Sequence, residues 1–118
     1  MHELSIAVGI VDAVLAEAEL RRLDFVTCVY VRLGALSGVD PDSLQFSFPM
    51  ACEGTALAGA RLEIEEVPVL ISCDACGADA PASPQQQECP RCGASATRIV
   101  QGREIELRAL EAAEGVHP

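Results

Sequence analysis

The first segment of the chain with a regular hydrophobic pattern runs from Leu4 to about Arg22. Its apolar residues recur at intervals of three and four, while Asp12, Glu17 and Glu19 fall largely off that stripe. This spacing predicts an amphipathic helix with one buried face. The stripe consists of Leu4, Ala7, Val8, Val11, Val14, Leu15 and Ala18.

Three later segments have the alternation of β-strands. Residues 25–33 are β-branched and apolar on both sides, which predicts a central strand. Residues 61–67 alternate, with Leu62 and Ile64 facing inward, and Pro68 marks the end of a strand on an edge or at a bend. Residues 103–110 form the third strand, with the inward positions Ile105, Leu107 and Ala109.

A second helix is predicted to begin at Asp40-Pro41-Asp42-Ser43, with Asp40 as N-cap and Pro41 as the first helical residue. Its apolar residues continue to Cys52, before Gly54. Because a proline inside a helix removes a backbone donor and strains the preceding turn, Pro49 is expected to kink or end this helix early. Residues 111–118 are expected to be a frayed tail.

Four cysteines form two CxxC pairs, Cys73–Cys76 and Cys89–Cys92, separated by twelve residues. Each pair is followed by a glycine, which can take the positive-φ turn of a metal-binding knuckle. Four thiolates at this spacing predict a zinc site, against the alternatives of a disulfide pair or loose thiols. Because four ligands fill the preferred shell of zinc, we expect one structural Zn(II) per chain with no position open for substrate.

These elements predict an α/β (α+β) fold: a small three-stranded sheet with two helices, and a zinc ribbon inserted between the second and third core strands. Residues 69–71 lead into the ribbon and residues 97–100 lead back. The expected domains are a discontinuous α/β domain of residues 1–69 and 97–118, and a four-cysteine zinc-ribbon domain of residues 70–96. The other two cysteines, Cys28 and Cys52, lie in apolar patterns and are expected to be small core residues.

Charge and composition limit which molecules this protein is expected to bind and where in the cell it is expected to act. The 118 residues include eight Arg, no Lys and eighteen acids, giving a net charge of -10. Residues 73–96 offer only Arg91 and no aromatic residue, so nucleic acid is not an expected partner. An acidic surface agrees with binding of cations or of a basic partner. It agrees equally well with charge that serves only to keep the protein in solution. No apolar run is long enough for a membrane span and residues 1–20 carry acids instead of a signal peptide, so a cytoplasmic protein is expected.

The sequence contains no catalytic motif, and we expect a binding protein rather than an enzyme. It has two histidines, of which His117 is expected to be solvated in the tail. His2 directly follows the initiator methionine, so its imidazole, its backbone nitrogen and the α-amine of Met1 can approach one point, together with the amide or carboxylate of Glu3. Nitrogen donors clustered in this way favour a square-planar ion such as Ni(II) or Cu(II).

Several of these segments together resemble the HypA/HybF family of hydrogenase maturation factors. The segments are Met1-His2-Glu3-Leu4-Ser5, residues 33–37 followed by Asp40, Leu44-Gln45-Phe46, Glu53-Gly54-Thr55 and the double CxxC, and the resemblance covers residues 1 to about 110. Pro49 departs from the uninterrupted second helix associated with that family.

The resemblance implies a nickel metallochaperone that delivers Ni(II) as transient cargo during maturation of nickel-iron hydrogenase. It implies nickel ligation by Met1, His2 and Glu3, with Asp40 either as a further ligand or as a supporting group, although its N-cap role accounts for Asp40 without nickel. It implies zinc ligation by Cys73, Cys76, Cys89 and Cys92. The implied partners are a HypB-type GTPase and the hydrogenase large-subunit precursor.

Two other functions stay open. A zinc-ribbon adaptor that binds only protein would need no second metal, and a rubredoxin-like electron carrier would place iron in the same two knuckles. The short ribbon and its lack of an aromatic core count against the electron carrier. The sequence leaves open whether the chain is a monomer or a homo-oligomer, and whether urease maturation shares it.

Overall fold

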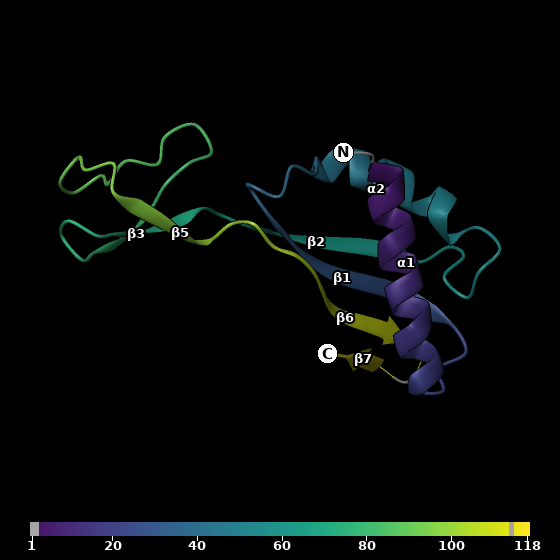
Figure 1. The fold of residues 1–118 in the computed structure, drawn as a ribbon. Coiled ribbons are helices and arrows are strands. Elements are labelled where there is room, and N and C mark those ends of the chain that lie inside the picture. Colours follow the sequence, from purple (N-terminus) through teal and green to yellow (C-terminus); the bar gives the residue numbers. More distant parts are fainter. Residues whose placement is uncertain (1–2, 114) are drawn as a thin grey trace. The chain divides into compact units, whose positions relative to one another are not determined.

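The computed structural model describes residues 3–113 and 115–118 of the chain. The chain divides into two compact units. The first unit consists of the residues up to Arg32, Val39–Glu65 and Glu106–Pro118, and the second of Leu33–Gly38 and Glu66–Ile105. Figure 1 shows the first unit with its two helices and the second with its small sheet and long loops.

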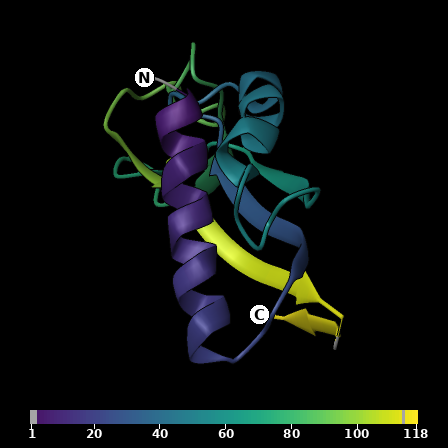
Figure 2. The same cartoon turned by 90° about the vertical axis from the view of Figure 1, so that its right-hand side faces the viewer.

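The first unit begins with α1 (Glu3–Leu20), which confirms the predicted helix. This helix crosses one face of the strands that follow (Figures 1 and 2). Its buried residues are Ala7, Ile10, Val11, Val14 and Ala18. Leu4 and Val8, which the periodicity placed on the buried stripe, are instead 45% and 42% exposed. The first two turns of α1 therefore present apolar side chains to solvent.

The sheet of the first unit has four strands rather than the expected three. These strands are β1 (Val26–Gly34), β2 (Arg61–Val67), β6 (Ile105–Ala112) and β7 (Gly115–His117), in the order β2-β1-β6-β7. The central position of β1 agrees with its apolar residues on both faces. The edge position of β2 agrees with the proline that follows it.

The extra strand comes from the tail that the sequence suggested was frayed. β7 pairs antiparallel with β6, with Glu111 opposite Val116. Arg21, which directly follows α1, also donates from Nη2 to the carbonyl oxygen of Pro118 at 2.9 Å. Pairing at the outer edge of β6 satisfies backbone groups that a frayed tail would leave to water.

The inward positions of β6 were only partly predicted. Ala109 is buried, but the adjacent Leu110 is buried too, so the alternation is interrupted within the strand. Ile105, expected to face the core, is 39% exposed.

The second helix, α2 (Pro41–Cys52), starts at the predicted cap. Ser43 donates to Oδ2 of Asp40 from its backbone nitrogen at 3.1 Å and from its hydroxyl at 2.7 Å. The expected early break at Pro49 is wrong, because the helix continues for three residues beyond it. Leu44, Phe48 and Cys52 are all at most 1% exposed and lie four residues apart, so burial of this stripe holds the last turn despite the missing donor.

The second unit contains a three-stranded sheet in the order β4-β3-β5, made of β3 (Leu70–Cys73), β4 (Asp79–Pro81) and β5 (Thr97–Gln101). β3 and β5 pair antiparallel with Ile71 opposite Ile99, as expected for strands leading into and out of a ribbon. The small core consists of Val69, Ile71, Cys73, Ala80 and Cys89, with Leu36, Ala82, Ala94 and Ile99 packed against it.

Residues 33–38 join this unit through a close backbone crossing. The amide of Gly34 donates to Glu104 at 2.7 Å, that of Ala35 to Val67 at 2.9 Å, and that of Leu36 to Gly102 at 2.7 Å. The unit around the cysteines thus includes segments on both sides of residues 70–96, the range that the cysteine spacing suggested.

Candidate metal centre

Two knuckles with the same backbone geometry carry the four cysteines. In the first, which begins at the end of β3, the amide of Gly77 donates to the carbonyl of Cys73 at 2.8 Å, and Gly77 has φ 74°. In the second, between β4 and β5, the amide of Gly93 donates to the carbonyl of Cys89 at 2.8 Å, and Gly93 has φ 75°. A side chain at either glycine would be strained by the positive φ, so each glycine after CxxC is required by the turn that folds the chain back over its sulfurs.

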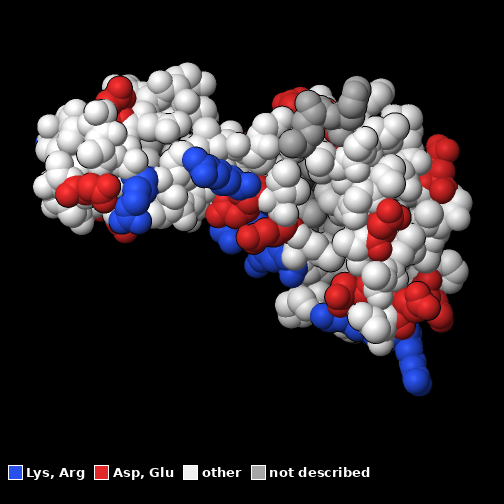
Figure 3. Space-filling view, in the orientation of Figure 1, with Lys and Arg blue, Asp and Glu red and all other residues white. Residues whose placement is uncertain are grey.

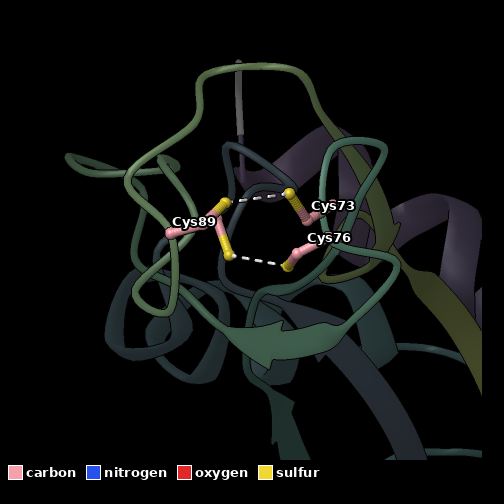
Figure 4. Close-up of side chains that lie close together, drawn as sticks. Cys73, Cys76 and Cys89 are labelled. Atoms are coloured by element: carbon pink, nitrogen blue, oxygen red, sulfur yellow. Dashed lines mark hydrogen bonds between the residues drawn. The ribbon is translucent and has the colours of Figure 1, made fainter.

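The knuckles bring the four sulfurs of Cys73, Cys76, Cys89 and Cys92 within 4.8 Å of one another. The sulfurs of Cys73 and Cys92 are 3.6 Å apart and those of Cys76 and Cys89 are 3.7 Å apart, and Figure 4 shows the two contacts facing each other across a common centre. Zinc–sulfur bonds of about 2.3 Å in a tetrahedron place the sulfurs about 3.8 Å apart. The thiols are therefore already spaced to hold a metal ion.

The two thiols of the second knuckle have pKa values shifted in opposite directions. Hydrogen bonds from the backbone amides of Cys92 and Arg91 lower the pKa of the Cys89 thiol to about 6. At Cys92 the amide of Ala94 acts in the same direction, but the sulfur of Cys73 and burial outweigh it and raise the pKa to about 11. A divalent cation at the centre of the cluster would favour the thiolate form of its ligands.

The cluster is open on one side. Cys73 and Cys89 are buried, whereas Cys76 and Cys92 are exposed. All six cysteines are free thiols, and Cys28 and Cys52 are buried in the first unit as small core residues. Among residues 3–113 and 115–118, the four cysteines are the only group of three or more His, Cys, Asp or Glu close enough to share an ion.

The other predicted metal site begins outside the described residues. Met1 and His2 lie outside them, and Glu3 is the first residue of α1. Glu3 lines a hollow of about 500 Å³ together with Leu4 and the first turns of α2. Asp42 and Ser43 line the same hollow, so the fold brings the start of α1 beside the start of α2.

Two acidic residues at the start of α2 differ in what they do. Hydrogen bonds from the hydroxyl and then the amide of Ser43 lower the pKa of Asp40, whose carboxylate is committed to the cap. Asp42 lines the hollow with Glu3 and was not a candidate from the sequence, where an acid in the first turn of a helix is ordinary.

His117, expected to be solvated, belongs to β7 and is partly buried. Its Nε2 is buried without a hydrogen-bond partner. It lines a cavity of about 230 Å³ with Glu17, Arg21 and β6. Pairing of β7 with β6 draws the imidazole in, which a free tail would not do.

No helix within the described part of the chain has the length and apolar character to cross a membrane.

Comparison with known proteins identifies a family. Residues 1–112 match the model of the HypA family, described as hydrogenase/urease nickel incorporation, metallochaperone. The hydrogenase maturation factor HypA of Chloroflexus aurantiacus is 50% identical over 112 residues, covering 94% of this chain and 98% of the relative. The hydrogenase maturation factor HypA of Chlorobium limicola is 40% identical over 115 residues, covering 98% of this chain and 99% of the relative.

The fold is also that of a solved structure. The solution structure of the Ni metallochaperone HypA from Helicobacter pylori matches with a TM-score of 0.69 and 24% identity, covering 95% of this chain and 97% of that chain. With the family match over nearly the whole chain, and a fold and cysteine cluster consistent with it, the chain belongs to the HypA family of nickel metallochaperones and hydrogenase maturation factors.

Proposed function

We propose that this protein binds Ni(II) at its chain start and delivers it during maturation of nickel-iron hydrogenase, acting without catalysis in the cytoplasm. The observation that carries the proposal is the family match, which begins at residue 1 and so includes Met1-His2-Glu3. The family description includes urease as well as hydrogenase, and the relatives named above are hydrogenase maturation factors, which favours hydrogenase.

The four-cysteine cluster is proposed to hold one structural Zn(II), through Cys73, Cys76, Cys89 and Cys92. Two of its sulfurs are buried in the core of the second unit, so the ion would stabilise that unit. Four thiolates complete the shell of zinc and leave no position for cargo. Nickel must then bind elsewhere.

The nickel ligands are proposed to be Met1, His2 and Glu3. Ligands that come from three consecutive residues can be released one at a time, which suits a protein that must pass its ion on. Asp40 already accepts two hydrogen bonds from Ser43, so we assign it to the helix cap and a supporting role at most.

The proposed partners are a HypB-type GTPase that supplies nickel or drives its release, and the hydrogenase large-subunit precursor that receives it. Divalent copper binds nitrogen sites more strongly than nickel does, so a backbone-nitrogen site cannot select nickel by affinity alone. A partner that presents the right ion solves that problem.

A calorimetric nickel titration tests this function. The native chain should bind one Ni(II), whereas His2→Ala and a chain with residues fused ahead of Met1 should lose stoichiometric binding. The matched control is His117→Ala, which removes the only other histidine. Affinity should also fall on acidification, since the imidazole and amine titrate near about pH 6.5 and 8 in peptides. Equal affinity in all four forms would refute the site and favour the protein adaptor.

A further inference from the structure

The four cysteines of the cluster differ in their exposure to solvent. Cys76 and Cys92 are exposed, whereas Cys73 and Cys89 are 1% and 2% exposed. The buried pair belongs to the small core of the second unit. A reagent in solvent therefore reaches one sulfur of each knuckle before it reaches the other.

Each exposed sulfur contacts a buried sulfur of the other knuckle. The Sγ atoms of Cys92 and Cys73 are 3.6 Å apart and those of Cys76 and Cys89 are 3.7 Å apart, the two contacts drawn as dashed lines in Figure 4. A disulfide bond is about 2.0 Å long, so each pair has to close by about 1.6 Å to form one. An exposed cysteine beside a second cysteine is the usual arrangement of a thiol that reacts reversibly with oxidants.

We propose that Cys76 and Cys92 are sites of oxidation by hydrogen peroxide, and that the oxidised cluster holds two disulfides that cross between the knuckles, Cys73–Cys92 and Cys76–Cys89. The release of zinc in this reaction rests on the proposed function, because the zinc ion is taken from it. The pairing of the cysteines rests on the structure alone.

The reaction has two steps at each pair of sulfurs. The exposed thiolate attacks one oxygen of peroxide, the O–O bond breaks, and a sulfenic acid forms while hydroxide leaves and is protonated to water. The buried sulfur then attacks the sulfenic sulfur, the S–S bond forms, the S–O bond breaks and a second water leaves. Each disulfide thus supplies the two electrons that reduce one peroxide to two waters. Because zinc binds thiolates, the ion is released as the disulfides form.

The crossed disulfides would replace the metal ion as the link between the two knuckles. They join cysteines that are 19 and 13 positions apart in the chain. A disulfide within one CxxC pair would close a loop of only four residues and would leave the knuckles unconnected. We therefore expect the second unit to stay folded after oxidation has removed its metal.

Exposure, more than charge, should decide which cysteines react. Over the second unit, Figure 3 shows few charged side chains and mostly uncharged surface. Hydrogen peroxide is itself uncharged, so the net charge of -10 does not repel it. Cys28 and Cys52 are 0% and 1% exposed in the first unit, so they serve as controls within the same chain.

A peptide map of the full chain, loaded with Zn(II) and treated with hydrogen peroxide, tests the proposal. Trypsin cleaves after Arg91 and Arg98, and a protease that cleaves before aspartate cuts before Asp74 and Asp79. The two enzymes together leave each cysteine of the cluster in a peptide of its own, so mass spectrometry identifies every disulfide. The expected linked peptides are Cys73 with Cys92 and Cys76 with Cys89, while Cys28 and Cys52 remain free thiols.

Three further measurements follow the same reaction. Dimedone, which traps sulfenic acids, should label Cys76 and Cys92 at early times and not their buried partners. A chromogenic chelator should detect full loss of zinc from the protein, and dithiothreitol with added Zn(II) should restore the loaded chain. Amide protection of residues 70–101 in hydrogen exchange should survive oxidation but not removal of the metal from the reduced chain.

Cys92→Ser gives a second test of the pairing. This variant should still form Cys76–Cys89 and leave Cys73 as a free thiol, whereas pairing within the knuckles would form Cys73–Cys76 and leave Cys89 free.

Several results would overturn the proposal. They are disulfides within the CxxC pairs, sulfinic or sulfonic acid in place of disulfides, dimedone labelling of the buried pair first, oxidation of Cys28 or Cys52 as fast as the cluster, and loss of protection on oxidation. If the purified protein does not bind zinc, the proposed role of zinc fails, and the peptide map of the reduced, metal-free chain still decides the pairing.

Discussion

Gly34→Ala should strongly destabilise the second unit, because the backbone leaves no room for a methyl group at this position. A Cβ at Gly34 would lie 2.1 Å from the carbonyl oxygen of Gly102 and 2.7 Å from the amide nitrogen of Arg103. Both neighbours are backbone atoms and cannot rotate away. Gly34 is therefore required by the close approach of two backbone segments.

The loss of stability in Gly34→Ala can be calculated from the backbone movement that the extra methyl group requires. To relieve the overlap, Gly34 and Gly102 must move apart by more than about 1 Å. Overpacking that forces backbone shifts of this kind costs about 1–3 kcal/mol of folding stability. The same movement stretches the hydrogen bonds from Gly34 to Glu104 and from Leu36 to Gly102, both 2.7 Å. At a net contribution of about 0.5–1.5 kcal/mol each, the expected loss totals about 2–6 kcal/mol.

Urea unfolding in the presence of added Zn(II), followed by circular dichroism, measures this loss. Gly9→Ala is the control, because no atom lies within 4 Å of a Cβ at Gly9 in α1. Alanine should stabilise that helix by about 0.5–1 kcal/mol. The reasoning fails if Gly34→Ala unfolds within about 0.5 kcal/mol of the native chain, a difference typical of harmless surface substitutions.

Two further predictions concern the metal cluster and the helix cap. If the cluster holds the proposed zinc ion, Cys76→Ser should lose that ion and the amide protection of residues 70–101 in hydrogen exchange, while α1 stays protected. Loss of protection throughout would contradict two separate compact units. Asp40→Asn should be less stable than the native chain at pH 7, because hydrogen bonds from the hydroxyl and amide of Ser43 lower the pKa of Asp40 in the folded protein below its ordinary value of 3.8. That stabilisation is present above about pH 4 and is lost as pH falls through the lowered pKa, so the gap between the two proteins, measured by thermal unfolding, should close on acidification. A gap that is unchanged down to pH 3 would argue against the cap. Any metal that the cysteine cluster loses in acid would be lost from both proteins alike.

Local chemistry determined the parts of this protein that the sequence predicted well. The two CxxC pairs and their glycines specify the knuckles, because a positive φ and four nearby sulfurs need only a few consecutive residues. Asp40 before Pro41 marked the start of α2 in the same way. β1 was predicted as central because a strand buried on both sides must be apolar on both sides.

Tertiary packing decided what the local pattern could not. The periodicity of α1 includes Leu4 and Val8, but burial depends on which elements cover the helix, and they stay exposed. Pro49 disfavours helix locally, yet Phe48 and Cys52 are buried and α2 continues past it. The tail became β7 because β6 offered an unpaired edge, a feature that exists only after the sheet has formed.

The cysteine cluster and the hollow between α1 and α2 differ in the same way. The cysteine cluster could be predicted from the sequence because each CxxC pair lies within four consecutive residues. The hollow that joins Glu3 and Leu4 to Asp42 and Phe46 was not, because its two sides are some forty residues apart and meet only when α1 and α2 pack. Sequence specifies the ligands that one segment can supply, and the fold decides which segments share a surface.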